Sequence, residues 1–465
     1  MKRPLEMDFS AGFAHCIRPL AASVMLATTA LLAPTSAAYA EPATAAIRVQ
    51  QVTSPGGIKA WLMEDRTVPL VTVSFAFRGG NSQDRPGREG TASLLVNTID
   101  EGAGQLSMTE FQRTLARLGV RVSFSSSDDH VGGSFATLVE NSEQAVGLVR
   151  SMLMEPRFEQ TSIDRVRALM LSQLAQRKKS PASLAYDRLR AVAYPGHAYG
   201  RGVGGSETSL AAITRADIDD FRRRVFARNT LVVSAAGAID ATALGNLLDR
   251  VFGDLPATAE LTAVARVTPL GAGRIEVVDI DVPQSVAYFQ LPGLMTSDPD
   301  YMAARVMTAI IGNGGFTSRL MKEIRIKRGL AYGVSASINV DLYTETWSGS
   351  VSSRNEAIKD AIDVVRAELK RMAAEGPTAE ELDETKSSMI GGFALNFDTI
   401  GSMASLMQTT QLDGLGVDYF TNRSALIERV TVADVKRAAT RLLDADRMLV
   451  VIAGRPKGLA TSGVN

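Results

Sequence analysis

Cysteine and histidine are nearly absent from this 465-residue sequence. It contains one cysteine, Cys16, and three histidines, His15, His130 and His197. Structural and catalytic zinc sites draw three or four ligands mainly from these two residue types, so a cysteine-based zinc site is excluded and a histidine-based one has almost no ligands. An excess of charge is missing too, because 50 Lys+Arg balance 50 Asp+Glu. Nucleic-acid-binding proteins show a basic excess, so we expect no nucleic acid among the partners.

Long apolar runs are also lacking. The run at 20–33 is shorter than the roughly 20 residues that span a membrane. It follows a charged N-terminus and precedes Ala38-Tyr39-Ala40, a small-x-small cleavage pattern. We therefore expect residues 1–40 to be a secretory signal peptide, the exported protein to lie in the periplasm, and the mature chain to have no stable membrane insertion. An N-terminal anchor helix is the alternative. Cleavage after Ala40 leaves no cysteine and two histidines.

The remainder of the chain uses one unit twice. Residues 213–237 (ITRADIDDFRRRVFARNTLVVSAAG) and 430–454 (VTVADVKRAATRLLDADRMLVVIAG) align without a gap. In each, a threonine followed three residues later by aspartate predicts a capped helix. The helix leads into an apolar segment that ends at glycine and predicts a buried strand. A repeat of about half the mature chain indicates a duplicated domain.

Other segments fit the same plan. Alternating residues in Val71–Phe77 and the similar Ser285–Leu291 predict a strand near the start of each half. Helices are predicted at Glu110–Leu118, Ile163–Gln176, Tyr301–Ile311 and Ala357–Ala374. We expect an α+β fold with two homologous domains, each a mainly antiparallel sheet with helices packed on one face. The predicted first domain is 41–256, the linker is 257–273, and the second domain is 274–465.

Common catalytic motifs do not occur. The glycine runs at 200–206 (GRGVGGS) and 312–315 (GNGG) lack the Lys-Ser/Thr ending of a P-loop and the βαβ context of a dinucleotide site. On a strand, Asp128 and His130 would point to the same side, but two ligands do not make a metal site, so we interpret them as a polar strand end. His197 lies in a turn sequence and is interpreted as a loop residue. No Gly-x-Ser-x-Gly elbow and no cysteine nucleophile remain.

Residues 312–340 (GNGGFTSRLMKEIRIKRGLAYGVSASINV) carry the most information. Thr317 or Ser318 is predicted to cap a helix that runs to Arg328 and ends at Gly329. A strand follows, and its alternation predicts one shared face for Tyr332, Val334, Ala336 and Ile338. Taken by their residue types alone, Arg325 is a cation near a helix C-terminus and Tyr332 is a strand aromatic with a hydrated hydroxyl.

The motifs of this segment resemble a known family. Ser318-Arg319-Leu320, Glu323-x-Arg325 and Arg328-Gly329-Leu330-Ala331-Tyr332 are similar, in order and spacing, to the second-domain motif of the pitrilysin-type zinc peptidases, in the branch of mitochondrial processing peptidase. The first half adds Glu155-Pro156-Arg157-Phe158 and Ser180-Pro181-Ala182-Ser183. The resemblance covers essentially the whole mature chain, including its duplication.

The resemblance implies roles for particular residues. Arg325 and Tyr332 match the family's Arg/Tyr pair, which reaches the substrate carbonyl and stabilises the oxyanion of the tetrahedral intermediate. We assign Gly314 and Gly315 to substrate binding. Peptides are the implied substrate class.

The first domain departs from the family. There the family carries His-x-x-Glu-His on a helix, which binds zinc and activates water. The corresponding helix here is 90–97, with Ser93 and Asn97 at the histidine positions and Val96 in place of the general base. The later ligand falls near Ser172-Gln173. Because these side chains cannot hold a catalytic zinc, we expect no cofactor in this chain.

Heterodimeric members of the family divide the work between homologous subunits, and this chain resembles the one that keeps the Arg/Tyr pair. The resemblance therefore implies a non-zinc-binding subunit of an exported metallopeptidase, inactive alone. Its homologous partner would carry the zinc motif and the zinc. One alternative is a peptide-binding or assembly protein of the same fold with no role in hydrolysis. Another is independent hydrolysis through an unrecognised site that includes His130.

Overall fold

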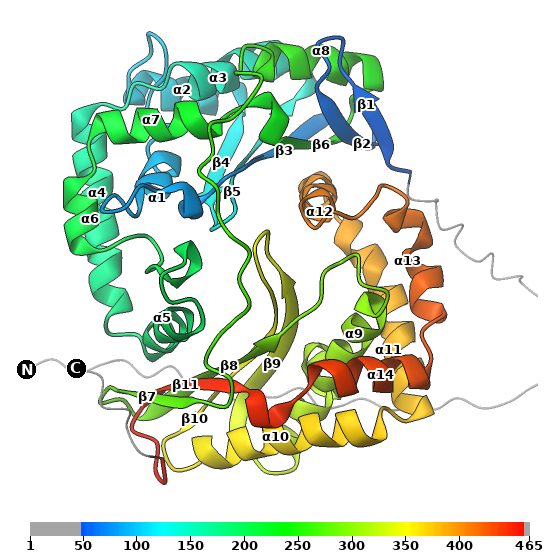
Figure 1. Cartoon of the computed structure of the whole chain (residues 1–465). Helices are drawn as coiled ribbons and strands as arrows, with labels where there is room; N and C mark the ends of the chain where they lie inside the picture. Colours follow the sequence, from blue (N-terminus) through cyan, green and yellow to red (C-terminus); the bar gives the residue numbers. More distant parts are fainter. Residues whose placement is uncertain (1–47, 460–465) are drawn as a thin grey trace, which may run out of the picture. The chain divides into compact units, whose positions relative to one another are not determined.

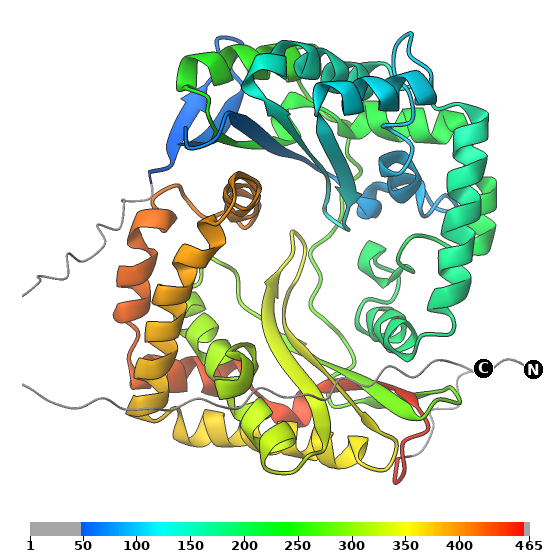
Figure 2. The ribbon, with the colours of Figure 1, turned by 180° about the vertical axis from the view of Figure 1, so that it is seen from behind.

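The structure is a computed structural model that describes residues 48–459. The expected signal peptide, 1–40, lies outside the described residues. Two β-sheets with their helices make up the described chain, and both belong to one compact unit. Figures 1 and 2 show the two sheets from opposite sides. Among residues 48–459, no helix has the length and apolar character needed to cross a membrane.

The first sheet has six strands in the order β1-β2-β6-β3-β5-β4. Neighbouring strands are antiparallel except for the parallel pair β2–β6. Their bounds are Gln50–Thr53 (β1), Lys59–Glu64 (β2), Leu70–Arg78 (β3), Arg121–Ser126 (β4), His130–Leu138 (β5) and Leu231–Gly237 (β6).

The second sheet repeats this topology with five strands in the order β7-β11-β8-β10-β9. Its one parallel pair, β7–β11, takes the place of β2–β6. The bounds are Ile275–Asp279 (β7), Gln284–Pro292 (β8), Ala331–Val340 (β9), Glu345–Arg354 (β10) and Leu449–Gly454 (β11). The predicted fold class, two homologous and mainly antiparallel α+β domains, is confirmed.

The helices follow the predicted pattern, including those expected at Glu110–Leu118, Ile163–Gln176 and Ala357–Ala374. The first half contains α1 (Thr91–Val96), α2 (Met108–Leu118), α3 (Ser142–Met154), α4 (Gln160–Arg177), α5 (Pro181–Ala193), α6 (Glu207–Ala212), α7 (Arg215–Val225) and α8 (Ala241–Phe252). The second contains α9 (Tyr301–Thr308), α10 (Ile358–Glu375), α11 (Ala379–Gly391), α12 (Ile400–Leu412), α13 (Tyr419–Glu428) and α14 (Val432–Leu442). The helix predicted to Ile311 changes at Thr308 into a π-helical turn, Ala309–Asn313.

The aligned repeat segments share their capping as well. Thr214 caps α7 and Thr431 caps α14, and in both cases the side-chain hydroxyl accepts the backbone N–H of the aspartate three residues later. That aspartate accepts the threonine N–H in return, at 2.8 Å for Asp217 and 2.9 Å for Asp434. Hydrogen bonds from Thr431 lower the pKa of Asp434 to about 2. The predicted capping boxes are thus present in both copies.

Each sheet has a second face that is covered in part by a helix from the other half. In the first sheet Leu62 faces the main core, whereas its neighbour Trp61 faces the other side and packs with Met407 of α12. In the second sheet Val450 faces the main core and Val451 packs with Leu189 of α5. Figure 1 shows α12 beside the first sheet and α5 beside the second. The sequence pattern predicted helices on one face of each sheet only. In the structure the two halves also exchange a helix: α5 of the first half covers the second sheet, and α12 of the second half covers the first sheet.

The segment between the sheets runs without helix or strand from 253 to 274. Hydrogen bonds tie it to both halves. The backbone N–H of Thr262 donates to Gln83 Oε1 at 2.7 Å, and that of Leu270 donates to Ala193 O at 2.9 Å. The N–H of Val267 donates to Tyr343 O of the second half at 2.8 Å.

Candidate functional site

A widened helical turn carries Arg325. The helix predicted from Thr317 or Ser318 to Arg328 is present in part, and its residues Met321–Ile326 are π-helical. Gly329 follows in the left-handed conformation, with φ +59°, as expected for a glycine that ends a helix. π-Helical turns are rare in proteins and are frequent at functional sites. Two of them, 309–313 and 321–326, flank the glycine-rich segment 314–318.

Tyr332 lies on a β-bulge. The pairing of β9 with β10 shifts between Ser352 and Ser353, so that Tyr332 has no partner in the ladder. Its side chain is 83% exposed, while Val334 and Ala336 are buried in the second core. The sequence prediction that Tyr332 shares a face with these residues and Ile338 is therefore wrong. The extra residue interrupts the alternation and turns the tyrosine outward, a use of bulges common beside functional sites.

The bulge and the π-helical turn meet in one contact. Arg325 Nη1 donates to the backbone oxygen of Tyr332 at 2.8 Å. The guanidinium carbon lies 4.7 Å from the centre of the Phe316 ring. These three residues line a shallow hollow of about 560 Å³ on the second half. The pair that the sequence singled out is thus brought together and faces solvent.

The two predicted substrate-binding glycines have different positions. Gly315 lines this hollow and has a φ of +60°, a conformation that other residues adopt at a cost. Gly314 does not line it; a Cβ atom there would lie 2.7 Å from Ala309 O. Gly314 is therefore a residue of the turn, and Gly315 of the hollow.

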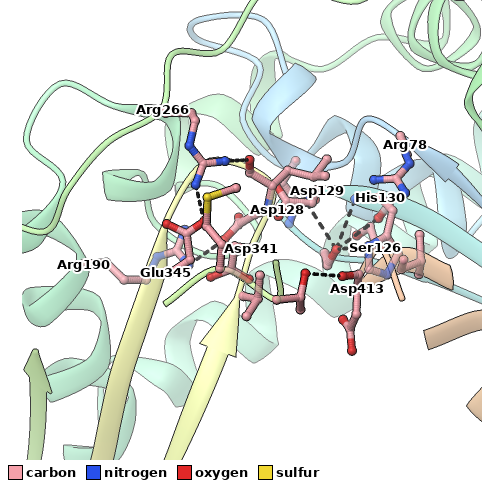
Figure 3. A pocket seen from close by; sticks show the side chains of 18 of the residues that line it. Arg78, Ser126, Asp128, Asp129, His130, Arg190, Arg266, Asp341, Glu345 and Asp413 are labelled. Carbon is pink, nitrogen blue, oxygen red and sulfur yellow. Dashed lines mark hydrogen bonds and ion pairs between the residues drawn. The ribbon is translucent and has the colours of Figure 1, made fainter. Parts of the chain in front are cut away.

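The hollow continues along the second sheet. It shares Ser335 and Ser350 with a cavity of about 320 Å³ over the face of β8, β9 and β10. That cavity is lined by hydroxyl and amide side chains, and it shares Asp128, Arg190 and Asp341 with a third cavity, shown in Figure 3. The three hollows therefore share lining residues and form a continuous surface from Arg325 and Tyr332 to the charged cavity of Figure 3.

The cavity of Figure 3 is lined by many charged side chains. Asp128 pairs with Arg190 at 2.6 Å, and Glu345 pairs with Arg266. Asp341 has no ion-pair partner within residues 48–459. Burial of its carboxyl group in the cavity, together with the nearby charges of Asp129 and Asp128, raises its pKa to about 7.

The acid–histidine segment spans the turn between two strands and the first residue of the second strand. Residues 127–129 connect β4 to β5, and His130 is the first residue of β5. Asp128 points to Arg190, while the His130 ring contacts Ser127 Oγ at 3.1 Å. No group of three or more potential His, Cys, Asp or Glu metal ligands occurs in the described part of the chain. His197 lies in a turn, as predicted, and its Nε2 contacts Ala265 O at 2.9 Å.

The residues at the zinc-motif positions do not fit a metal. Ser93 Oγ lies 3.3 Å from Ser126 Oγ, and Asn97 Nδ2 donates to the backbone oxygen of Ser93 at 2.8 Å. Val96 belongs to the first hydrophobic core. On α4, Ser172 and Gln173 are exposed and offer no carboxylate. The hydroxyl, amide and alkyl groups at these positions would not hold a zinc ion.

The sequence does not indicate the role of two residues of the site. One is Phe316, for which the only local signal is an aromatic residue after two glycines. The other is Asp129, which the sequence places only within a polar segment. It accepts the Tyr199 hydroxyl at 2.5 Å and the backbone N–H of Leu342 at 2.8 Å, partners 70 and 213 residues away that no local pattern indicates.

Comparison with known protein families assigns the chain to one of them. The model described as Insulinase (Peptidase family M16) matches residues 60–207, and the model described as Peptidase M16 inactive domain matches residues 212–389. The chain belongs to peptidase family M16. This confirms the resemblance to the zinc peptidases that its motifs predicted. The sequence contains no His-x-x-Glu-His, so the chain is a family member without the family's zinc motif.

Individual relatives of this M16 protein carry different names. The "Non-peptidase homolog YmxG" of Helicobacter pylori is 24% identical over 80% of this chain and 86% of its own. The "Mitochondrial-processing peptidase subunit beta" of Lentinula edodes is 22% identical over 80% of this chain and 82% of its own. The crystal structure of a peptidase M16 inactive domain from Pseudomonas fluorescens has a TM-score of 0.82 and 25% identity, and the match covers 89% of this chain and all of that one.

Proposed function

We propose that this M16 protein is the non-zinc-binding subunit of a heterodimeric exported metallopeptidase. In this proposal it supplies Arg325 and Tyr332 to peptides held at the zinc site of a homologous partner. The observation that carries the proposal is the exposed pair itself. A bulge turns Tyr332 out of the sheet, and Arg325 is fixed to its carbonyl oxygen, yet the zinc-motif positions of the same chain do not fit a metal.

The pair suits the stabilisation of an oxyanion. A guanidinium offers five N–H donors and a phenol one O–H donor, and both are charge-compatible with a developing negative oxygen. Donors fixed in advance stabilise the transition state more than the ground state, since little reorganisation accompanies the reaction. The cavity along β9 and β10, which adjoins the hollow, offers hydroxyl and amide partners for the backbone of an extended peptide.

Reconstitution tests the proposal. The chain is mixed with the zinc-motif homologue of the same organism, and peptide cleavage is compared with that of the homologue alone. We expect a gain that Arg325→Ala reduces by about 10²–10³-fold, the usual loss for one such donor. Lys322→Ala is the matched control, because Lys322 is a cation on the same turn that does not line the hollow. A mixture no faster than the homologue alone contradicts the proposal.

Export is part of the same proposal and is supported by the pattern of residues 1–40. Cell fractionation of the tagged full-length chain tests it. We expect the chain in the periplasmic fraction, shortened by the length of the signal peptide on mass spectrometry. Full-length chain in the cytoplasmic fraction would contradict export, but it would not test the proposed role of Arg325.

A second candidate function is a peptide-holding or assembly protein without a part in hydrolysis. The observation that favours it is the similarity to a protein named "Non-peptidase homolog". It predicts that the chain co-purifies with a partner whose peptide cleavage is the same with Arg325→Ala as with the unchanged chain. The effect of Arg325→Ala on peptide cleavage therefore distinguishes the two candidate functions.

A further inference from the structure

Phe316 is an exposed aromatic residue that the hydrophobic cores do not explain. It is 61% exposed and belongs to neither main core. It lies in the segment between the two π-helical turns, directly after Gly314 and Gly315. Its ring contributes instead to the hollow with Arg325 and Tyr332.

The ring and the Tyr332 carbonyl hold Arg325 from two directions. The carbonyl oxygen accepts one Nη1 hydrogen, and the guanidinium carbon lies 4.7 Å from the ring centre. A cation at this distance over an aromatic face is attracted by the ring quadrupole. Among residues 48–459 the Arg325 side chain makes no other hydrogen bond or ion pair, so the remaining N–H donors are free for a ligand.

The backbone before Phe316 is built from glycines for steric reasons. Gly315 adopts a φ of +60°, and a Cβ at Gly314 would lie 2.7 Å from Ala309 O. At Gly312, a Cβ would lie 2.8 Å from the Ala336 Cβ. The tight loop sets the Phe316 ring beside the π-helical turn that carries Arg325.

We propose that Phe316 is a positioning residue for Arg325. Its ring restricts the long arginine side chain to the orientation in which the free N–H donors face the substrate carbonyl. The inference rests on the proposed function, since it assigns Phe316 to the same site. It acts through Arg325 and forms no bond to the reacting atoms.

Kinetics of the reconstituted mixture test this role. We expect Phe316→Ala to lower kcat about two- to fivefold with little change in KM, the range expected for one exposed cation–π contact. Phe316→Tyr keeps the ring and should keep kcat. Phe316→Leu keeps apolar volume without the ring and should match Phe316→Ala. Ile326→Ala is the control, because Ile326 is also 61% exposed and does not line the hollow.

A double-mutant comparison decides whether Phe316 acts through Arg325. In the Arg325→Ala background, Phe316→Ala should cause no further loss of kcat, because the contact is already gone. A full additional loss would show an independent role and overturn the inference. Equal kcat for Phe316→Ala, Phe316→Leu and the unchanged chain would overturn it as well.

A spectroscopic test on the chain alone separates this inference from the proposed function. The Arg325 Nε–Hε NMR signal, identified by its loss in Arg325→Lys, should lie upfield because of the Phe316 ring current. It should move downfield in Phe316→Leu and stay in Phe316→Tyr. If the signal does not move, the inference fails whatever the mixture does. If it moves as expected but Arg325→Ala leaves cleavage unchanged, the proposed function fails.

Discussion

The carboxylate of Asp129 accepts the backbone N–H of Leu342 at 2.8 Å. Asp129 lies in the β4–β5 turn of the first sheet, and Leu342 lies in the β9–β10 turn of the second, so equivalent turns of the duplicated domain meet. The same carboxylate accepts the Tyr199 hydroxyl at 2.5 Å. Asp129 is buried, and this burial raises its pKa. One carboxyl group therefore joins the two copies of the fold.

Replacing Asp129 should weaken the connection between the halves. Asp129→Ala leaves the Leu342 N–H and the Tyr199 hydroxyl without their acceptor, so we expect the free energy of unfolding to fall by about 1–3 kcal/mol. Urea unfolding measures it. Asp413→Ala is the control. Asp413 lines the cavity of Figure 3, as Asp129 does, but its carboxylate accepts no hydrogen bond within residues 48–459. An equal loss in both variants would assign the effect to cavity charge and not to the contact.

The exchange of α5 and α12 predicts that the halves unfold together. The sequence has two tryptophans. Trp61 packs with Met407 of α12 and meets the ring of Phe420 of α13 edge-on at 6.0 Å, and Trp347 lies inside the second core. In the single-tryptophan variants Trp61→Phe and Trp347→Phe, each remaining fluorophore reports on a different region. We expect the fluorescence of each tryptophan to change in a single transition as urea is raised, and the two transitions to coincide, which is the usual sign of cooperative unfolding.

Separate transitions for the two tryptophans would contradict cooperative unfolding. If the halves were independent, the Trp61 signal and the Trp347 signal would change at different urea concentrations. Circular dichroism on both variants corrects for any stability lost through the substitutions themselves. Two steps by circular dichroism would show that the exchanged helices contribute little to the stability of the sheets they cover.

Much of the fold was predictable because its signals are local or repeated. The Thr214 and Thr431 capping boxes, and the apolar strands that follow them, follow from spacing within a few residues. The duplication was visible because 213–237 aligns with 430–454 without a gap. The family motif then indicated Arg325 and Tyr332, and the structure places them in contact.

The rest depends on contacts that no local pattern contains. Strand alternation predicted one shared face for Tyr332, Val334 and Ala336, because one unpaired residue in a ladder leaves no mark in residue types. The packing of α5 on the second sheet and of α12 on the first joins segments far apart in the chain. Asp128 was expected on a strand because a turn between two polar strand ends resembles the strands themselves.

Asp84 should make stability depend on pH. Its buried carboxylate accepts the N–H groups of Gly90 and Ala92 at the start of α1, and burial raises its pKa to about 7. Because this folded-state pKa is above the usual value near 3.8, its contribution is fully present below pH about 4 and is lost as the pH rises through 7. We expect the free energy of unfolding to fall by up to about 4 kcal/mol between pH 4 and 8 from this group.

The Asp84→Asn variant isolates that dependence. The amide does not titrate, so this part of the slope should disappear. The variant should also lose stability at every pH, since its NH₂ group faces a backbone N–H and one hydrogen bond of about 1–3 kcal/mol is not replaced. Urea unfolding at several pH values between 4 and 8 measures both effects. Equal slopes in the two proteins would show that Asp84 is ionised throughout this range.

The zinc content of the purified chain distinguishes the remaining alternatives. We expect far less than one zinc per chain after dialysis, because Ser93, Val96 and Asn97 offer no imidazole or carboxylate ligands. Inductively coupled plasma mass spectrometry measures the metal, and the zinc-motif homologue prepared in parallel is the control, with about one zinc per chain expected for a three-ligand catalytic site. Stoichiometric zinc that His130→Ala abolishes would support independent hydrolysis at a site around that residue. It would remove the reason to look for a partner's zinc, whereas a zinc-free chain that still accelerates its homologue leaves Arg325 and Tyr332 as its contribution.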